Sequence, residues 1–230
     1  MIPLRDANPT RRTPLVTLAL IGACTAVFAV ELAVEGSAGE AALSEFFVAW
    51  GAIPSRISAA LGGAGDGAAA AVGLLASLFL HGGWVHLAGN MLFLWIFGNN
   101  IEDRLGRLPF LAFYIVGGVA AALTQVWIDP TSDVPLIGAS GAIAATLGAY
   151  IVLYPRARIL ALVFLVFIYQ LVEVPALLVL GYWFLLQLVD GVASLGAASA
   201  QGGVAFFAHI GGFVAGGLVG FAVRLTSRQG

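Results

Sequence analysis

The sequence predicts an all-α membrane protein, a bundle of six transmembrane helices with both termini on the cytoplasmic side. Of its 230 residues, 60% are hydrophobic and only 10% are charged, which excludes an ordinary soluble domain. Several apolar runs reach about 20 residues, the length that crosses a bilayer as a helix. All ten basic residues are arginine, and a six-span arrangement places nine of them on one side, as expected for a cytoplasmic face.

The predicted spans follow the apolar runs in chain order. They are Pro14–Leu32, Trp84–Asn99, Leu108–Trp127, Gly138–Tyr154, Pro175–Val189 and Val204–Leu225. The second span can extend upstream through Leu74–Leu80. The apolar stretch Ile159–Val174 is rich in β-branched and aromatic residues, so we interpret it as a connection lying along the membrane. Counting it as a seventh span would move the C-terminal arginines to the outer side, against the charge rule.

These spans define a simple domain organisation. Residues 1–12 form a short cytoplasmic N-terminus, residues 13–225 a single membrane domain, and residues 226–230 a short cytoplasmic tail. An outer loop of about residues 33–72 carries an aromatic stretch and a glycine-rich run. A functional role and a plain interfacial tether are equally compatible with this loop. The first span is long and lacks a convincing cleavage site, which favours a retained anchor over a signal peptide.

The composition excludes several classes of function. Lysine is absent and no basic cluster is present, so we expect no nucleic-acid partner. Cys24 is the only cysteine, which excludes a disulfide within the chain. The histidines lack the cysteine or carboxylate neighbours that would complete a metal site. We therefore expect neither a metal nor another cofactor.

Two polar residues lie inside predicted spans among small neighbours. Ser140 stands in the fourth span and His209 in the last. A serine alone is more typical of helix packing than of chemistry. A buried imidazole, however, is unfavourable in a membrane without a partner, and Ser140 can supply one. The pair predicts a nucleophile and its base, the components of covalent hydrolysis, without an obligatory carboxylate.

Small residues surround both positions at helical spacing. In the last span they recur every fourth residue, a pattern typical of close helix contact. The small residues are Gly138 and Gly141 around the serine, and Ala208, Gly212, Gly216 and Gly220 around the histidine. The pattern predicts that the fourth and sixth spans pack tightly, with Ser140 and His209 at their contact.

A second pair, His86 and Asn90, lies four residues apart at the start of the second span, so both side chains share one face of the helix. Inside a membrane such a pair must point into the bundle. Donors to a developing oxyanion and a structural hydrogen bond between helices are equally compatible with it.

Taken together, these motifs resemble those of the rhomboid intramembrane serine proteases. The matching segments are Gly138-Ala139-Ser140-Gly141, Ala208-His209 with Gly212 and Gly216, His86 with Asn90 preceded by His81, and Glu102-Asp103-Arg104-Leu105-Gly106. The likeness extends, in order, from the second span to the last. It implies the same six-helix fold and the same reaction.

The resemblance also implies roles for the residues. Ser140 would attack the scissile carbonyl, and His209 would act as the base and then as the acid. His86 and Asn90 would line the oxyanion hole together with the Ser140 backbone N–H. The fifth helix and the following cap, Gly191–Gly203, would gate lateral entry of a substrate helix. The partners would be single-span or polytopic membrane proteins in the lipid bilayer, cut near their outer ends.

The chain departs from the family pattern at one position. Family members often carry a tyrosine four residues after the nucleophile, stacked on the catalytic histidine, where this chain has Ala144. The imidazole must then be held by helix packing or by an aromatic ring such as Phe213 or Phe206.

Two alternative functions stay open: a rhomboid-like protein that binds membrane clients without cutting them, and a small polytopic transporter. A pseudoprotease typically loses the serine or the histidine, and a transporter more often has charged residues at the midplane. We expect a bacterial plasma membrane, because residues 1–12 are too short for a transit peptide. The sequence does not indicate an oligomeric state.

Overall fold

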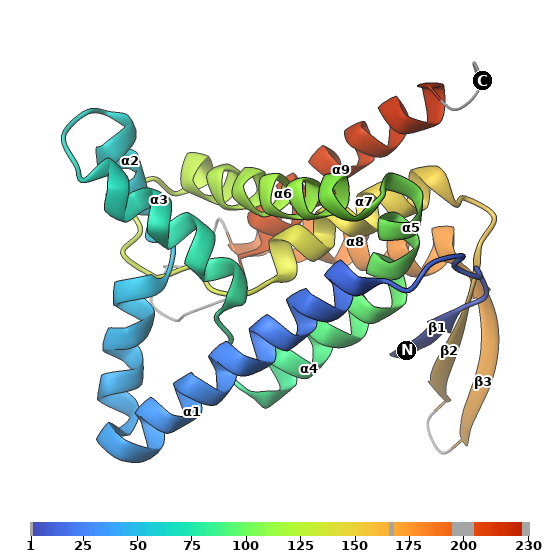
Figure 1. Ribbon diagram of the computed structural model, residues 1–230, viewed down its shortest axis with the longest axis horizontal. Coiled ribbons are helices and arrows are strands. Elements are labelled where there is room, and N and C mark those ends of the chain that lie inside the picture. The colour runs from blue at the N-terminus through green and yellow to red at the C-terminus, as the bar shows by residue number, and fades with distance from the viewer. Residues whose placement is uncertain (1, 166–167, 195–204, 227–230) are drawn as a thin grey trace.

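The computed structural model describes residues 2–165, 168–194 and 205–226, and most of them are helical (Figure 1). The helices are α1 Leu15–Trp50, α2 Pro54–Leu61, α3 Gly67–Ala76, α4 Trp84–Phe93, α5 Asn99–Leu105, α6 Arg107–Ile128, α7 Ser140–Leu153, α8 Ala176–Ser194 and α9 Phe206–Thr226. Two short elements, the 3₁₀ turn η1 Ser77–Phe79 and the π-helical turn η2 Leu94–Gly98, interrupt this series. Helices α4, η2 and α5 follow one another without a break, so the second predicted span continues beyond Asn99 to Leu105.

Four helices, α1, α6, α8 and α9, are long and apolar enough to cross a membrane. A bent pair of segments gives a fifth span if the two are counted together. The first segment, Gly67–Phe79, comprises α3 and η1; the second, Trp84–Leu105, comprises α4, η2 and α5; and they meet at 82°. Helix α7 is apolar but has only 14 residues. Helices α6 and α9 coincide with the third and sixth predicted spans to within two residues at each end. The chain is thus a multi-pass helical membrane protein, while the six-span count and the orientation of the termini stay predictions.

The segment of about residues 33–72, predicted as an outer loop, is mostly helical, while its place outside the membrane stays a prediction. Helix α1 continues to Trp50, and α2 and α3 follow. The chain changes direction within α1 at Gly39, whose φ of 85° is in the region that favours glycine. Figure 1 shows the result as two arms of α1 meeting at a sharp angle. Three glutamates after Leu32 end the apolar run without ending the helix, because glutamate is a good helix former.

The expectation of an all-α chain is wrong in one region. Arg158–Leu165 (β2) and Ile168–Pro175 (β3) form an antiparallel pair of strands, where the sequence predicted a connection along the membrane without assigning strands. Residues Ile2–Asp6 (β1) of the predicted N-terminal segment add a third strand beside β2. The abundance of β-branched and aromatic residues in Ile159–Val174 is the physical reason, since such residues suit a pleated sheet.

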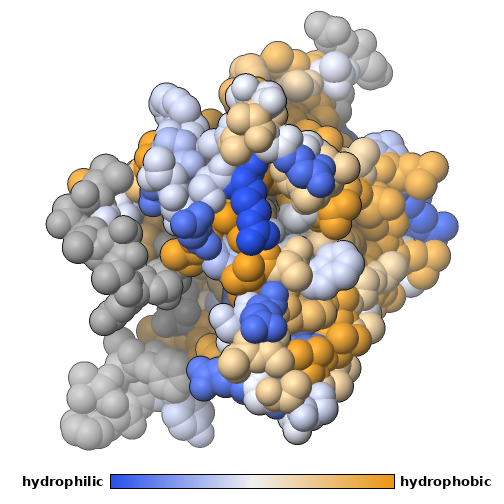
Figure 2. Space-filling view, turned by 90° about the vertical axis from the view of Figure 1, so that its left-hand side faces the viewer, coloured by the Kyte–Doolittle hydropathy of each residue, from blue (hydrophilic) through white to orange (hydrophobic). Residues whose placement is uncertain are grey.

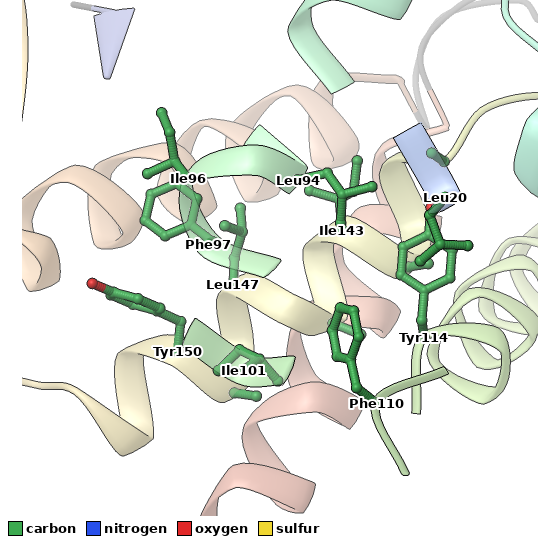
Figure 3. Close-up of a cluster of buried hydrophobic side chains, with 14 of the residues drawn as sticks. Leu20, Leu94, Ile96, Phe97, Ile101, Phe110, Tyr114, Ile143, Leu147 and Tyr150 are labelled. Carbon is green, nitrogen blue, oxygen red and sulfur yellow. The ribbon is translucent and has the colours of Figure 1, made fainter. Parts of the chain in front are cut away.

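Helix α7 lies at the centre of the bundle, and every residue from Gly141 to Tyr150 is buried. Figure 3 shows Ile143, Leu147 and Tyr150 of this helix among side chains from η2, α5 and α6. The ring of Tyr150 meets that of Phe97 edge-on at a centroid distance of 5.0 Å. A short helix buried on all sides is held by its protein neighbours instead of by lipid, which fixes the position of its first residue, Ser140.

A small-residue seam lets α9 lie directly against α7. A Cβ atom added at Gly216 would collide with the backbone of Ala145, and one added at Gly148 would collide with the backbone of Phe213. Only glycine permits this backbone approach in a membrane bundle. The seam therefore brings the first turn of α9, with His209, next to the start of α7.

Glu102, which follows the second predicted span, is buried, with only 3% of it exposed. Its carboxylate accepts hydrogen bonds from the backbone N–H groups of Val16 (3.0 Å) and Thr17 (2.8 Å) and from the Thr17 hydroxyl (2.8 Å). Those N–H groups belong to the first turn of α1 and have no partner within the helix. Glu102 thus caps α1 from a distant part of the chain.

Replacing Glu102 by alanine is expected to lower the free energy of unfolding by about 1–3 kcal/mol, because two buried N–H groups lose their acceptor. Thermal unfolding of the purified protein in detergent measures the change. Glu45→Ala, which removes an exposed carboxylate from α1, is the control and should leave the unfolding temperature unchanged. Equal unfolding temperatures for the two variants would contradict the capping role.

Candidate active site

The polar residues singled out in the sequence gather around one cavity of about 900 Å³ inside the bundle. The cavity is bounded by residues of α4, α7, α8 and α9 and by the segment 134–137 before α7. Four of the predicted site residues line it: His86, Asn90, Ser140 and His209. Three-dimensional packing thus unites residues that are far apart in the chain.

Ser140 is the first residue of α7, and His209 lies in the first turn of α9. The Ser140 Oγ atom and the His209 Nε2 atom are 2.7 Å apart, a hydrogen-bond distance. Because Nε2 must accept the hydroxyl proton for Ser140 to become a nucleophile, the ring proton belongs on Nδ1. The backbone N–H of Ser140 is at the N-terminus of α7, where the helix dipole favours negative charge.

The Nδ1 atom of His209 meets the Oε1 atom of Gln187 on α8 at 2.7 Å. One turn earlier on the same helix, the Trp183 ring lies 5.8 Å from the imidazole, centroid to centroid. Neither Gln187 nor Trp183 was predicted as a neighbour of His209. Phe213 and Phe206 were the predicted aromatic supports, but Phe213 packs on Trp183 and Phe184, behind the ring that lies against His209. A polar Gln inside a predicted span was the available signal.

His86 faces the start of α7. Its Nδ1 atom accepts the Gly82 backbone N–H at 3.3 Å, so the ring proton is on Nε2. A Cβ atom added at Gly138 would come within 2.8 Å of this Nε2 and within 3.5 Å of the Ser140 Oγ atom. The φ of 126° at Gly138 likewise favours glycine. Gly138 therefore leaves room for the His86 ring close to Ser140.

Asn90 lies one turn after His86 on α4 and is 8% exposed. Its Nδ2 atom is buried and has no hydrogen-bond partner among the described residues. A buried donor without an acceptor is unfavourable and calls for an explanation. A ligand oxygen in the cavity would supply the missing acceptor. The Nε2–H group of His86 could donate to the same oxygen.

His81 does not line the cavity. Its backbone N–H donates to the Glu31 carboxylate of α1 at 3.0 Å, and its ring meets the His86 ring edge-on at 5.1 Å. Glu31 is only 1% exposed and is not among the residues that the sequence singled out. Glu31 holds the turn before α4, so its influence on the cavity passes through His81 and His86.

Four glycines that the sequence places around Ser140 and His209 make different contacts. Gly212 and Gly216 of α9 lie against the backbone of α7, at the carbonyl groups of Gly141 and Ala145. Gly141 faces the other way, and a Cβ atom there would lie 2.7 Å from the Ala121 side chain of α6. Gly138 accommodates His86, as described above.

The polar side chains at the cavity include those of a serine, two histidines and an asparagine. Among residues 2–165, 168–194 and 205–226, no three His, Cys, Asp or Glu side chains are grouped as a metal site requires. The predicted cap, residues 191–203, lies largely outside the described residues. A serine hydroxyl bonded to an imidazole, beside donors from His86 and Asn90, has the composition of a site for covalent acyl transfer. The fold is that of a multi-pass membrane protein, and the candidate site joins a serine, an imidazole and two further polar side chains at one cavity.

Comparison with known proteins identifies the family. The model of the rhomboid domain matches residues 68–226, so the chain belongs to the rhomboid family. One similar relative is "Rhomboid protein 1, mitochondrial" of Saccharomyces cerevisiae, with 31% identity over 66% of this chain and 42% of the relative. A second is Rhomboid protease AarA of Providencia stuartii, with 30% identity over 66% of this chain and 56% of the relative. A third is Rhomboid protease GluP of Bacillus subtilis, with 32% identity over 67% of this chain and 28% of the relative. The chain thus spans less than two thirds of these relatives' own length.

Proposed function

We propose that this chain is an intramembrane serine endopeptidase that cleaves transmembrane segments of other membrane proteins. The observation that carries the proposal is the 2.7 Å contact between the Ser140 Oγ and His209 Nε2 atoms in a cavity within the bundle. Membership of the rhomboid family supports it, because that family comprises intramembrane proteases and related inactive proteins. The names of two relatives contain the word protease.

In the proposed reaction, the Ser140 oxygen attacks the scissile carbonyl carbon while the hydroxyl proton passes to His209 Nε2. The carbonyl oxygen becomes negative and accepts hydrogen bonds from His86 Nε2–H, Asn90 Nδ2–H and the Ser140 backbone N–H. The C–N bond then breaks, and the leaving amine takes the proton from His209. A water molecule, deprotonated by His209, then attacks the acyl carbon. The bond between this carbon and the Ser140 oxygen breaks, the Ser140 oxygen takes the proton from His209, and the second product leaves with a new carboxyl group.

Covalent labelling distinguishes this function from a client-binding or transport protein. A fluorophosphonate probe reacts with an activated serine, so we expect one labelled site in the wild type and none in Ser140→Ala. Labelling that persists in Ser140→Ala would place the reactive serine elsewhere. A folded wild-type protein that takes no label would instead favour the inactive rhomboid-like alternative.

We further propose that the protein resides in a bacterial plasma membrane with both termini in the cytoplasm. The described arginines Arg5, Arg11, Arg12, Arg104, Arg107, Arg156, Arg158 and Arg224 support this orientation by the charge rule. Relatives named as mitochondrial show that the family also serves another membrane. A reporter fused after Gly230 should therefore be cytoplasmic; an external reporter would overturn both the orientation and the six-span count.

A further inference from the structure

We infer that Gln187 is the positioning residue of the proposed dyad: its side-chain oxygen holds the His209 ring in the tautomer and orientation that Ser140 requires, and Trp183 supports the same ring. This inference rests on the proposed function. If the inference holds, the proposed activity also requires α8 to lie against α9, where Gln187 and Trp183 reach His209.

A continuous chain of two hydrogen bonds carries the inference. The distances from Ser140 Oγ to His209 Nε2 and from His209 Nδ1 to Gln187 Oε1 are both 2.7 Å. Both ring nitrogens therefore have a partner, and both His209 and Gln187 are only 9% exposed. With the proton on Nδ1 directed to an acceptor, Nε2 remains free to receive the serine proton. Without Gln187, either nitrogen could carry the proton, and one of the two tautomers cannot act as a base toward Ser140.

An amide is a chemically suitable acceptor at this depth. A carboxylate would bind the Nδ1–H more strongly, but it would place a charge in a low-dielectric interior. The amide oxygen accepts the same hydrogen bond while remaining neutral. Ala144, whose side chain is too short to reach over the imidazole, lies against Gly212 on the α7–α9 seam, which leaves the ring to the residues of α8.

Both supporting side chains come from one helix, on one face. Trp183 and Gln187 are four residues apart on α8, so they reach His209 together. Phe213 of α9 packs on Trp183 at 6.1 Å and stacks on Phe184 at 4.5 Å, which docks α8 beside the imidazole. Elsewhere α8 exposes large apolar side chains, at Leu177, Leu178, Tyr182, Leu185, Val189 and Val192. A displacement of α8 from α9 would remove both supports of His209 in one step.

The test compares Gln187→Met, which keeps the length of the side chain but removes the amide oxygen, with Gln187→Glu, which keeps an oxygen acceptor. We expect Gln187→Met to lower kcat about 10- to 100-fold with KM unchanged, since part of the general-base contribution is lost. Gln187→Glu should regain most of the lost kcat. Tyr182→Phe removes an exposed polar group from the same helix and should change neither constant.

Nitrogen-15 NMR of the imidazoles supplies a readout independent of turnover. The chain has only three histidines, so His209 can be assigned with His81 and His86 variants. The wild type should show a pure Nδ1–H tautomer at His209, and Gln187→Met a mixture. A folded Gln187→Met protein with wild-type kcat and a pure tautomer would overturn the inference, as would a folded Gln187→Glu protein that shows the pure Nδ1–H tautomer at His209 and is still as slow as Gln187→Met. If the wild type cuts nothing, the proposed function fails while the tautomer result still decides the role of Gln187.

A separate observation points to a binding site at the opposite end of the molecule from α2. A cavity of about 740 Å³ lies among residues 7–8, 153–158 and 224. Three arginines from different segments line it: Arg156 before β2, Arg158 at the start of β2, and Arg224 in the last turn of α9. The charge rule explains why arginines occur at this end, but not why they converge on one cavity.

The charges around this cavity are unbalanced. Arg224 donates to the Val152 carbonyl at the end of α7 at 3.2 Å, and Arg158 lies 3.8 Å from the exposed Glu173 carboxylate. The residues that line the cavity thus include three arginines and no carboxylate, while Asp6 and Asp103 lie near Tyr154 of the same lining. We propose that the cavity binds the phosphate of an anionic phospholipid headgroup, because guanidinium groups pair with phosphate oxygens and basic pockets at helix ends select such lipids.

Native mass spectrometry in nanodiscs containing phosphatidylcholine and phosphatidylglycerol tests the site. We expect the wild type to retain phosphatidylglycerol preferentially, and the double variant Arg156→Gln, Arg158→Gln to lose this preference. Arg5→Gln removes an arginine at the same end that does not line the cavity and should behave as wild type. An equal loss of the lipid preference in the double variant and in Arg5→Gln would overturn the site, because the preference would then follow from the general positive charge of the surface. Displacement of the lipid by millimolar inorganic phosphate would show that the site recognises the phosphate alone and would overturn the lipid assignment.

Discussion

Replacing Ser140 by alanine is expected to abolish cleavage of a single-span model substrate in liposomes, lowering kcat/KM on the order of 10⁴-fold or more. The hydroxyl supplies the attacking oxygen, and no other described hydroxyl lies within hydrogen-bond distance of a His209 ring nitrogen. Because alanine also fits the first position of α7, the variant should fold and insert normally.

The matched control is Ser37→Ala, which removes an exposed hydroxyl from α1. It should cut the substrate at the wild-type rate. Residual cleavage by Ser140→Ala at more than a few per cent of that rate, at the same bond, would refute the assignment of the nucleophile. Sequencing of the products gives the bond that is cut.

The second large effect is expected at the proposed oxyanion hole. His86→Ala and Asn90→Ala should each lower kcat by about 10²–10³-fold with little change in KM, because each donor serves the charge that develops in the transition state. Removal of Asn90 should also remove a buried unpaired donor, so its unfolding temperature should not fall. This combination of lost turnover and kept stability separates a catalytic donor from a structural hydrogen bond.

Met91→Leu, a change of similar volume on α4, provides the control for packing. Its kcat and unfolding temperature should match those of the wild type. If either alanine variant keeps full kcat, the replaced residue is not a catalytic donor and has only a structural role between helices. Fluorophosphonate labelling should persist in both variants, since Ser140 and His209 remain.

The proximity of Ser140 and His209 could be predicted, because a histidine beside a small-residue seam needs a partner and a seam implies close contact. Their catalytic roles stay predictions. The contact with Gln187 could not be predicted in this way. One polar residue in an apolar helix does not reveal which neighbour it faces, and only the packing of α8 on α9 brings its oxygen to His209. The same holds for Glu31, whose acceptor role depends on the turn before α4.

The helices were predictable where an apolar run and a helix have the same limits, as in α6 and α9. They were not predictable in Ala33–Trp50, where glutamates end the apolar run but allow the helix to continue. The hairpin of β2 and β3 was missed for the opposite reason. Its residues are as apolar as a span, and the choice between strand and membrane-hugging loop depended on pairing with each other and with β1.

The length of α7 determines how deep Ser140 lies below the membrane surface. Its 14 residues extend about 21 Å at 1.5 Å per residue, against a hydrocarbon layer of roughly 30 Å. In the proposed orientation, with α7 perpendicular to the membrane and its C-terminal end at the arginine-rich surface, Ser140 would lie about 9 Å below the opposite surface, a depth of about six helical residues. A substrate helix of the proposed protease would then present its scissile bond about two turns inside its outer end, and lengthening that end by one turn should move the cut by one turn along the sequence.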